Sequence, residues 1–311
     1  MELDIFLIEK ASIPLSIALA FIAGVAATLQ ASVSGQLAHE LNDGIMAALI
    51  SNIGGTIFMS LFLLNPEVRS KFKKLINQVK EKKFAKWQLL GGIAGAIYIS
   101  TASSTVSIIG TGLFTVILVA SQNISGIFVD KFGFSSGKKR NITKKRFLAM
   151  TIGIVAVFFS VSEFNGEILW IPIIAVVVAG LAVTMQFALN ARVTKASNSQ
   201  VSAFINFPMS MFAVTITLII MNLFGKDWIN WPSQWWLYTA GILGAIVVYL
   251  AAAVVRTLGV LLFSLATVAG QLVTSIFLDV IMPNANINVG WALIFGAALM
   301  LFAVYLASDL R

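Results

Sequence analysis

The eight residues AGVAATLQ (Ala23–Gln30) return about half a chain later as AGLAVTMQ (Ala179–Gln186). Five of the eight positions are identical, and both stretches end on a glutamine within an otherwise apolar segment. A glutamine at membrane depth must find a hydrogen-bond partner or line a wet cavity. The repetition therefore raises two hypotheses together: an internal repeat, and a polar site built from matching positions of its two copies.

The residues around these stretches are typical of a membrane protein. Of the 311 residues, 59% are hydrophobic and 11% are charged, whereas a soluble domain carries roughly a quarter charged residues. The apolar residues form runs of about 20, which is the length of a membrane-spanning helix. The sequence predicts an all-α membrane protein with ten spans, at 15–37, 44–64, 87–108, 111–130, 147–162, 168–190, 199–222, 235–256, 259–281 and 289–308.

The positive charges predict the direction of these spans. With the N-terminus in the cytoplasm, 20 of the 21 lysines and arginines fall on the cytoplasmic side, and Lys226 is the exception. Because cytoplasmic loops carry the excess of positive charge, we expect both termini to be cytoplasmic. The basic loop from Glu67 to Lys86 has apolar residues at helical spacing, so it is either an amphipathic helix on the inner leaflet or a solvated loop. The net charge of +8 reflects this topology and requires no nucleic acid partner.

The repeat extends beyond its first helix. An offset of 154 residues pairs Asn52 with Asn206, and an offset of 149 residues adds further pairs: Trp87 with Trp236, Gly92 with Gly241, Gly95 with Gly244, Gln122 with Gln271 and Asp130 with Asp279. The sequence thus predicts two five-helix repeats, residues 1–162 and 163–311. Since five is odd, the second repeat enters the membrane from the opposite side, as in many secondary transporters.

Several motifs resemble those of the drug/metabolite transporter superfamily, in particular its YdcZ-like, EamA-related branch in a fused two-unit form. They are AGVAATLQASVSGQLA from Ala23, SNIGG at Ser51–Gly55, GGIAGAIYI at Gly91–Ile99 and VASQNISGIFVDKFG at Val119–Gly133. The second half departs from the pattern where SNIGG is replaced by INFPM. The resemblance implies a ten-helix carrier of the bacterial inner membrane that exports small metabolites or drugs.

A few polar residues lie near the middle of the predicted spans and are the candidate substrate-binding residues. They are Gln30, Asn52, Gln122, Asn123, Gln186, Asn206 and Gln271, with Tyr98 and Tyr249 as further candidates. Glycines follow Asn52 and a proline follows Asn206, so we expect both helices to be weakened beside an asparagine. Matched interruptions in two repeats indicate a transporter site. The alternative is that these amides only bridge neighbouring helices.

The sequence says less about energy coupling and partners. Asp130 and Asp279 are the only carboxylates on the repeated helices, so they are the candidate coupling residues, and a passive or exchange mechanism stays open. The chain has no cysteine and a single histidine, and we expect no cofactor and no metal. The expected partners are a small-molecule substrate and membrane lipids, with a homodimer as an open option.

The leading hypothesis is a secondary transporter, not an enzyme, that moves a small neutral, zwitterionic or amphiphilic molecule by alternating access. Two hypotheses from other classes remain at this stage. A non-transporting membrane scaffold would tolerate the loss of the central amides. An intramembrane lipid-modifying enzyme would need acid, base or metal groups at membrane depth, where this chain has neither cysteine nor histidine and no clustered carboxylates.

Overall fold

A computed structural model describes residues 12–134, 143–161, 170–222, 231–281 and 291–308, and in these residues the chain is entirely helical. The α-helices are α1 (Ile13–Leu41), α2 (Gly44–Ser60), α3 (Pro66–Lys80), α4 (Gly91–Phe132), α5 (Lys144–Val161), α6 (Trp170–Ala196), α7 (Ser199–Asn222), α8 (Ala240–Leu258), α9 (Val260–Ile281) and α10 (Trp291–Ser308). Short 3-10 turns, η2 (Leu61–Leu64), η3 (Lys86–Leu89) and η4 (Trp235–Thr239), adjoin α2, α4 and α8. Helices therefore occupy the described residues of each predicted span.

Within the described residues, six helical segments are long and apolar enough to cross a membrane. They are Ile13–Leu41, Gly44–Leu64, Lys86–Val106, Trp170–Ala196, Ser199–Met221 and Trp235–Leu258. A shorter apolar helix covers Val260–Ser275. The predicted repeat boundary at 162/163 and the exceptional Lys226 lie outside the described residues.

The turn between α1 and α2 shows how local chemistry sets the helix ends. Asn42 adopts a left-handed conformation with φ 49°, which asparagine tolerates better than most residues, and it ends α1. The Asp43 side chain then accepts hydrogen bonds from the backbone N–H groups of Ile45 at 2.9 Å and Met46 at 3.1 Å. This N-cap starts α2 without a loop, so α1 and α2 form a tight hairpin.

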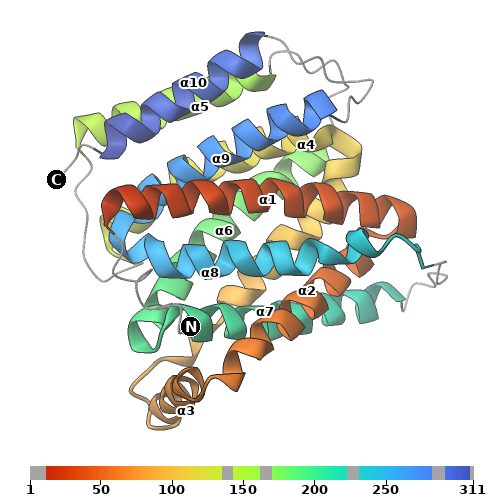
Figure 1. Cartoon of the computed structure of the whole chain (residues 1–311), viewed down its shortest axis with the longest axis vertical. Coiled ribbons are helices and arrows are strands. Elements are labelled where there is room, and N and C mark those ends of the chain that lie inside the picture. Colours follow the sequence, from red (N-terminus) through yellow and green to blue (C-terminus); the bar gives the residue numbers. More distant parts are fainter. Residues whose placement is uncertain (1–11, 135–142, 162–169, 223–230, 282–290, 309–311) are drawn as a thin grey trace.

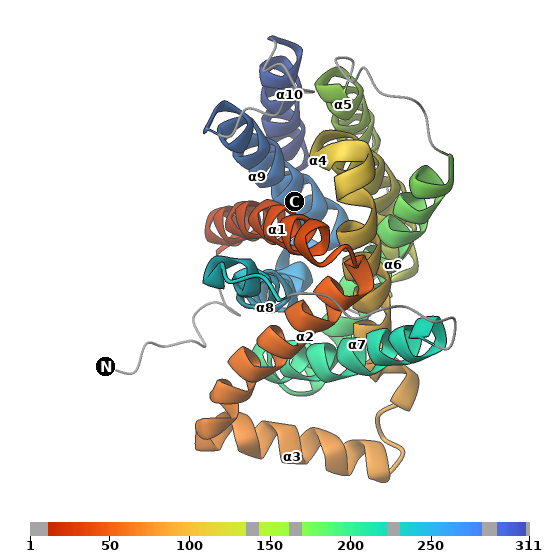
Figure 2. The same cartoon turned by 90° about the vertical axis from the view of Figure 1, so that its right-hand side faces the viewer.

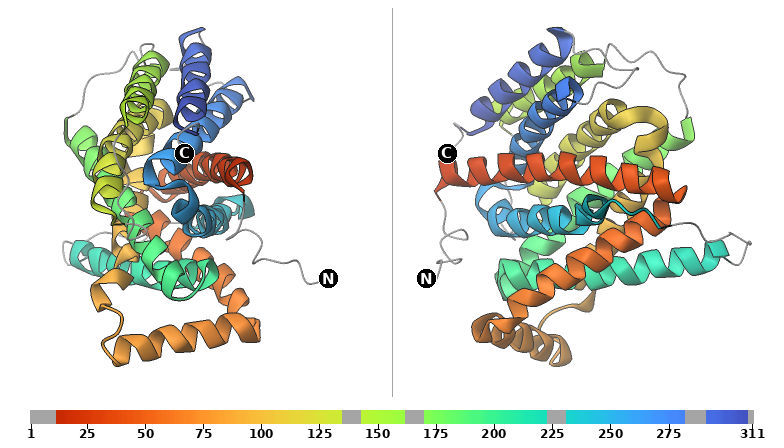
Figure 3. Two further views of the ribbon diagram at one scale, coloured as in Figure 1. Left: turned by 90° about the vertical axis from the view of Figure 1, so that its left-hand side faces the viewer. Right: turned by 45° about the vertical axis from the view of Figure 1, so that its right-hand side comes forward.

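The expected break between spans 87–108 and 111–130 is wrong in one respect, because α4 is helical through it. Two contacts nevertheless show that α4 doubles back. A Cβ at Gly95 would meet the Gln186 amide of α6 at 2.7 Å, and one at Gly180 of α6 would meet the Leu118 carbonyl at 2.8 Å. In straight helices Gly95 and Leu118 would be about 35 Å apart, while Gly180 and Gln186 are only about 9 Å apart. The bend in α4 is visible in the right-hand view of Figure 3.

Close helix crossings hold the centre together. Gly24 of α1 and Gly270 of α9 face each other. A Cβ at Gly24 would lie 1.9 Å from the carbonyl oxygen of Thr267, and a Cβ at Gly270 would lie 2.1 Å from that of Phe21. Small residues at such crossings let backbones approach closely, which is how helices associate in lipid. The α5 and α10 helices lie side by side above this centre, against α4 and α9 (Figure 1).

The basic loop predicted between spans two and three is helical. The α3 helix lies across the end of the bundle, as Figure 2 shows, and part of its apolar face packs against α6 and α7. Val68 and Leu75 are buried against Val193 of α6 and Val201 of α7. The reading as a solvated loop is therefore wrong and the predicted helix is confirmed, while its contact with the inner leaflet stays a prediction.

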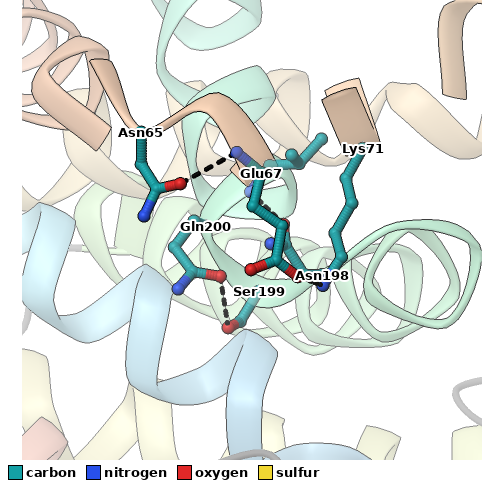
Figure 4. Close-up of polar contacts among 7 residues, drawn as sticks. Asn65, Glu67, Lys71, Asn198, Ser199 and Gln200 are labelled. Atoms are coloured by element: carbon teal, nitrogen blue, oxygen red, sulfur yellow. Dashed lines mark hydrogen bonds and ion pairs between the residues drawn. The ribbon is translucent and has the colours of Figure 1, made fainter. Parts of the chain in front are cut away.

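The corner between α6 and α7, on which α3 rests, is polar at its turn. Asn198 is fully buried, and its side-chain oxygen accepts from the Val201 N–H at 2.9 Å, which starts α7. Figure 4 shows this corner beside the first turn of α3, where Asn65 accepts from the N–H of Glu67 and Lys71 pairs with the Glu67 carboxylate at 3.1 Å. The α3 helix is thus capped and docked at one end of the bundle.

Candidate functional site

A cavity of about 60 Å³ lies among α1, α2, α4, α6, α7, α8 and α9. We call it the central cavity. Its polar lining residues are Gln30, Ser51, Asn52, Tyr98, Gln122, Gln186, Asn206, Ser210, Thr267 and Gln271. One water molecule needs roughly 10–15 Å³ of cavity volume, so this cavity has room for only a few waters. In this conformation the space at the polar centre of the bundle is small.

Seven of the nine predicted substrate-binding residues line the central cavity, and they come from helices far apart in the sequence. The two exceptions are Asn123, whose side chain lies outside the described residues, and Tyr249. The Tyr249 ring instead stacks on Phe62 with 6.1 Å between centroids and packs in the apolar cluster around Met59. The sequence indicates the depth of Tyr249 in its helix but not the direction of its side chain, and its role in substrate binding stays a prediction.

Three amides on α6 and α7 are linked to one another. Gln186 of α6 donates to Asn206 Oδ1 of α7 at 2.7 Å, and Asn206 donates in turn to Asn190 Oδ1. The Gln186 amide lies against Gly95, where a Cβ would approach it to 2.7 Å. This chain of amides joins α6 to α7 beside the cavity, so part of the predicted set does bridge helices.

Two amides of the first half, on Asn52 and Gln30, make no side-chain hydrogen bond to another helix within the described residues. The Asn52 amide donates to the Ala48 carbonyl of its own helix at 2.9 Å. Gln30 makes no side-chain hydrogen bond within the described part of the chain, and its amide lies against Gly244, where a Cβ would approach it to 2.4 Å. Residues that correspond in the sequence repeat thus occupy the same cavity with different hydrogen bonding.

The expected weak points in α2 and α7 do not interrupt either helix. The α2 helix continues through Gly54 and Gly55, and α7 contains Pro208 in its interior. A Cβ at Gly55 would lie 2.3 Å from the ring of Phe207, so this glycine provides room for an aromatic side chain of the cavity. Pro208 has no N–H for the carbonyl four residues earlier, which leaves that carbonyl without its helical partner.

Of the two carboxylates proposed for coupling, the structure describes the side chain of Asp130 alone. Asp130, at the end of α4, is buried, and its oxygens accept from the backbone N–H groups of Val260 at 2.9 Å and Leu261 at 3.3 Å. It therefore caps the first turn of α9, where the helix dipole favours a negative charge. The side chain of Asp279 lies outside the described residues, and neither coupling role is tested.

We expect Asp130→Ala to lower the stability of the purified protein by about 1–2 kcal/mol, because two buried N–H groups lose their acceptor. Asp130→Asn keeps one acceptor oxygen and should lose less than half as much. Thermal unfolding in mild detergent measures both variants. A cap contributing nothing would leave the melting temperature of Asp130→Ala equal to that of the wild type.

Three polar cavity residues were missed in the sequence: Ser51, Ser210 and Thr267. Ser210 lies one helical turn beyond Asn206, so the spacing of the two residues could have indicated it. Serines and threonines are common in apolar helices, where their hydroxyls bond to the helix's own carbonyls, and this is why hydroxyl content alone did not distinguish them.

An all-helical bundle whose apolar helices surround a buried polar cavity defines a multi-pass membrane protein. Comparison with known proteins identifies its family. Residues 15–159 and residues 171–306 each match the family model described as "Putative inner membrane exporter, YdcZ", so the chain belongs to the YdcZ family of the drug/metabolite transporter superfamily. It is a multi-pass protein of the inner membrane.

A solved structure supports the fold. One crystal structure, titled only as that of a protein, is 14% identical in sequence and superposes with a TM-score of 0.65 over 95% of this chain and 96% of that chain. At this identity the likeness concerns the fold alone. None of the curated proteins matches this chain.

Proposed function

We propose that this protein is a secondary transporter that moves a small neutral, zwitterionic or amphiphilic metabolite or drug out of the cell by alternating access at the central cavity. The observation that carries the proposal is the cavity itself, where seven predicted residues from both halves of the chain converge. The family description as an inner membrane exporter supports the direction of transport.

The proposal includes ten spans, cytoplasmic termini and two inverted repeats, residues 1–162 and 163–311. The separate family matches to 15–159 and 171–306 support two units. Packing around the cavity supports their correspondence: Gly95 makes room for Gln186 of the other half, and its repeat partner Gly244 makes room for Gln30. A second pair of glycines packs in the same way. A Cβ at Gly92 would lie 2.2 Å from the carbonyl oxygen of Asn206, and a Cβ at Gly241 would lie 2.2 Å from that of Ser51.

The two rival classes fit less well. A scaffold is expected to have a dry core in which neighbouring helices satisfy every amide. Yet no residue that the structure describes forms a hydrogen bond with the buried Oε1 of Gln271. An intramembrane enzyme would need acid, base or metal chemistry. The described residues contain no group of three or more His, Cys, Asp or Glu side chains that could hold a metal ion.

The test uses the absence of native cysteine. Ala27 lines the cavity, is 5% exposed and is small enough to be replaced by cysteine. In alternating access, Ala27→Cys should react with membrane-impermeant sulfonatoethyl methanethiosulfonate from both faces, in right-side-out and in inside-out vesicles.

Two control variants calibrate the labelling. Ala102→Cys, in a buried cluster, should stay unlabelled, and Lys73→Cys, on the exposed face of α3, should react from the cytoplasmic face alone. Labelling of Ala27→Cys from neither face would contradict a carrier and favour a scaffold.

A further inference from the structure

Two buried polar atoms of the central cavity have no hydrogen-bond partner among the described residues. They are the hydroxyl oxygen of Ser210, on α7, and Oε1 of Gln271, on α9. The two residues are 3% and 6% exposed. A buried polar atom without a partner is costly in a protein and more so in a membrane, where water is absent. A ligand that supplies the missing partners would remove this cost.

The Ser210 hydroxyl departs from the pattern of its neighbours. On α7 the hydroxyls of Thr215 and Thr217 donate to the carbonyls four residues earlier, at 2.8 and 3.1 Å. For Ser210 the carbonyl four residues earlier belongs to Asn206. The backbone of Gly92 packs against this carbonyl, since a Cβ at Gly92 would lie 2.2 Å from its oxygen. The α4 helix thus packs closely on the carbonyl that the Ser210 hydroxyl would otherwise bind, and the hydroxyl can bond to a ligand in the cavity.

Gln271 differs in the same way from its repeat partner. Gln122 Oε1 accepts from the Ser264 hydroxyl at 3.4 Å, whereas Gln271 Oε1 accepts from no donor in the described part of the chain. The backbone of Gln271 is held by Thr28 of α1, whose hydroxyl donates to its carbonyl at 3.3 Å. The main chain is therefore fixed by protein while the amide oxygen is free to accept from a ligand.

The remainder of the lining indicates the charge of that ligand. Within the described residues, the cavity contains no Asp, Glu, Lys, Arg or His, and Tyr98 is its only titratable side chain. Taking an ion out of water costs far more than an apolar cavity returns unless a counter-charge is present. The rings of Phe187 and Phe207 instead offer an apolar surface to the body of the ligand.

We infer that Gln271 and Ser210 are the residues that bind the polar group of the ligand, and that this ligand is uncharged and carries an N–H or O–H donor on an apolar body. Gln271 Oε1 accepts the donor hydrogen, and the Ser210 hydroxyl bonds to the same polar group. This assignment rests on the proposed function, since it names the substrate class of the same cavity, and it excludes the zwitterion that the broader proposal allows.

Thermal stability of ligand-free protein tests the assignment of the two residues. Gln271→Met and Ser210→Ala remove atoms that lack partners, so each should raise the melting temperature by about 2–4 °C. Gln186→Met removes a donor on which Asn206 depends and should lower it by at least as much. A fall in the melting temperature with both Gln271→Met and Ser210→Ala would overturn the inference, because it would mean that these atoms stabilise the fold.

Protection of the Ala27→Cys reporter tests the ligand class. Benzamide at 10 mM, which has an N–H donor on a ring and no charge, should slow labelling of the cysteine at least threefold. Benzoate and benzylammonium have the same ring but carry a charge, and N,N-dimethylbenzamide is neutral but has no N–H donor. These three compounds should not slow labelling of the cysteine. Benzamide without effect, or charged probes with an equal effect, would overturn the proposed class.

Two matched variants test whether the benzamide protection depends on Gln271. Gln271→Met should abolish the benzamide effect, and Thr274→Val should retain it, since the Thr274 hydroxyl already donates to the Gly270 carbonyl at 2.8 Å on the same helix. The two proposals can fail separately. An unlabelled Ala27→Cys contradicts the transporter, whereas labelling from both faces without benzamide protection contradicts only the ligand class.

Discussion

Gly24→Ala is expected to destabilise the protein by at least about 3 kcal/mol, the upper end of what overpacking usually costs. A methyl group at Gly24 would lie 1.9 Å from the Thr267 carbonyl oxygen and 3.0 Å from the Gln271 nitrogen. Both are backbone atoms of α9, which cannot rotate away as a side chain can. The α1 and α9 helices would have to separate, and the cavity residue Gln271 would move with them.

Gly54→Ala provides the matched control. It is also a glycine within an apolar helix, but the atoms nearest to its built Cβ are at 3.6 Å and 3.7 Å, which is ordinary contact. Alanine is favoured over glycine in helices by roughly 0.5–1 kcal/mol, so this variant should be neutral or slightly stabilised. The measurements are the melting temperature and the monodisperse fraction after mild detergent extraction. Equal melting temperatures for the two variants would show that α1 and α9 do not cross at Gly24.

A disulfide between Ser125→Cys and Thr184→Cys is expected to stop alternating access. The two hydroxyl oxygens are 2.8 Å apart, on α4 and α6, so the sulfurs can reach bonding distance with small side-chain rotations. In the proposed arrangement Ser125 belongs to the first repeat and Thr184 to the second. Oxidation would fasten the repeats to each other, and Ala27→Cys should then lose labelling from at least one face.

A second disulfide pair serves as the control for this lock. Ser34 on α1 and Ser103 on α4 have hydroxyl oxygens 2.7 Å apart, but both belong to the proposed first repeat. Ser34→Cys with Ser103→Cys should form a disulfide equally well and leave two-sided labelling unchanged, and reduction should restore labelling in the Ser125–Thr184 variant. If both disulfides block labelling, or neither does, the two repeats do not move as separate units.

Much of the fold could be predicted because lipid restricts the choices. A backbone in hydrocarbon must satisfy its own hydrogen bonds, so an apolar run of 20 residues is read as a helix with little ambiguity. The predicted bounds of 199–222 agree with those of α7, and most others lie within a few residues. The sequence predicts two separate spans, 87–108 and 111–130, whereas α4 is one helix that bends sharply between them.

The candidate residues could be predicted for a related reason. Amides are rare at membrane depth, so each one is informative, and seven of the nine candidates line one cavity. Tyr249 was not distinguishable from Tyr98 by depth, since both lie in the middle of a span. Asp130 could be placed at the end of its helix, but the helix that it caps begins 130 residues later in the sequence.

The sequence by itself determined the class of the protein, the positions of its helices and the small set of polar side chains at membrane depth, because each follows from the cost of polar groups in hydrocarbon. Only the tertiary structure decided which of these side chains satisfy one another. Gln186 and Gln271 appear equivalent in the sequence, yet Gln186 donates to Asn206 while Gln271 Oε1 has no partner within the described ranges. A hydrogen bond depends on distances of a few tenths of an ångström between helices, and helix packing sets those distances.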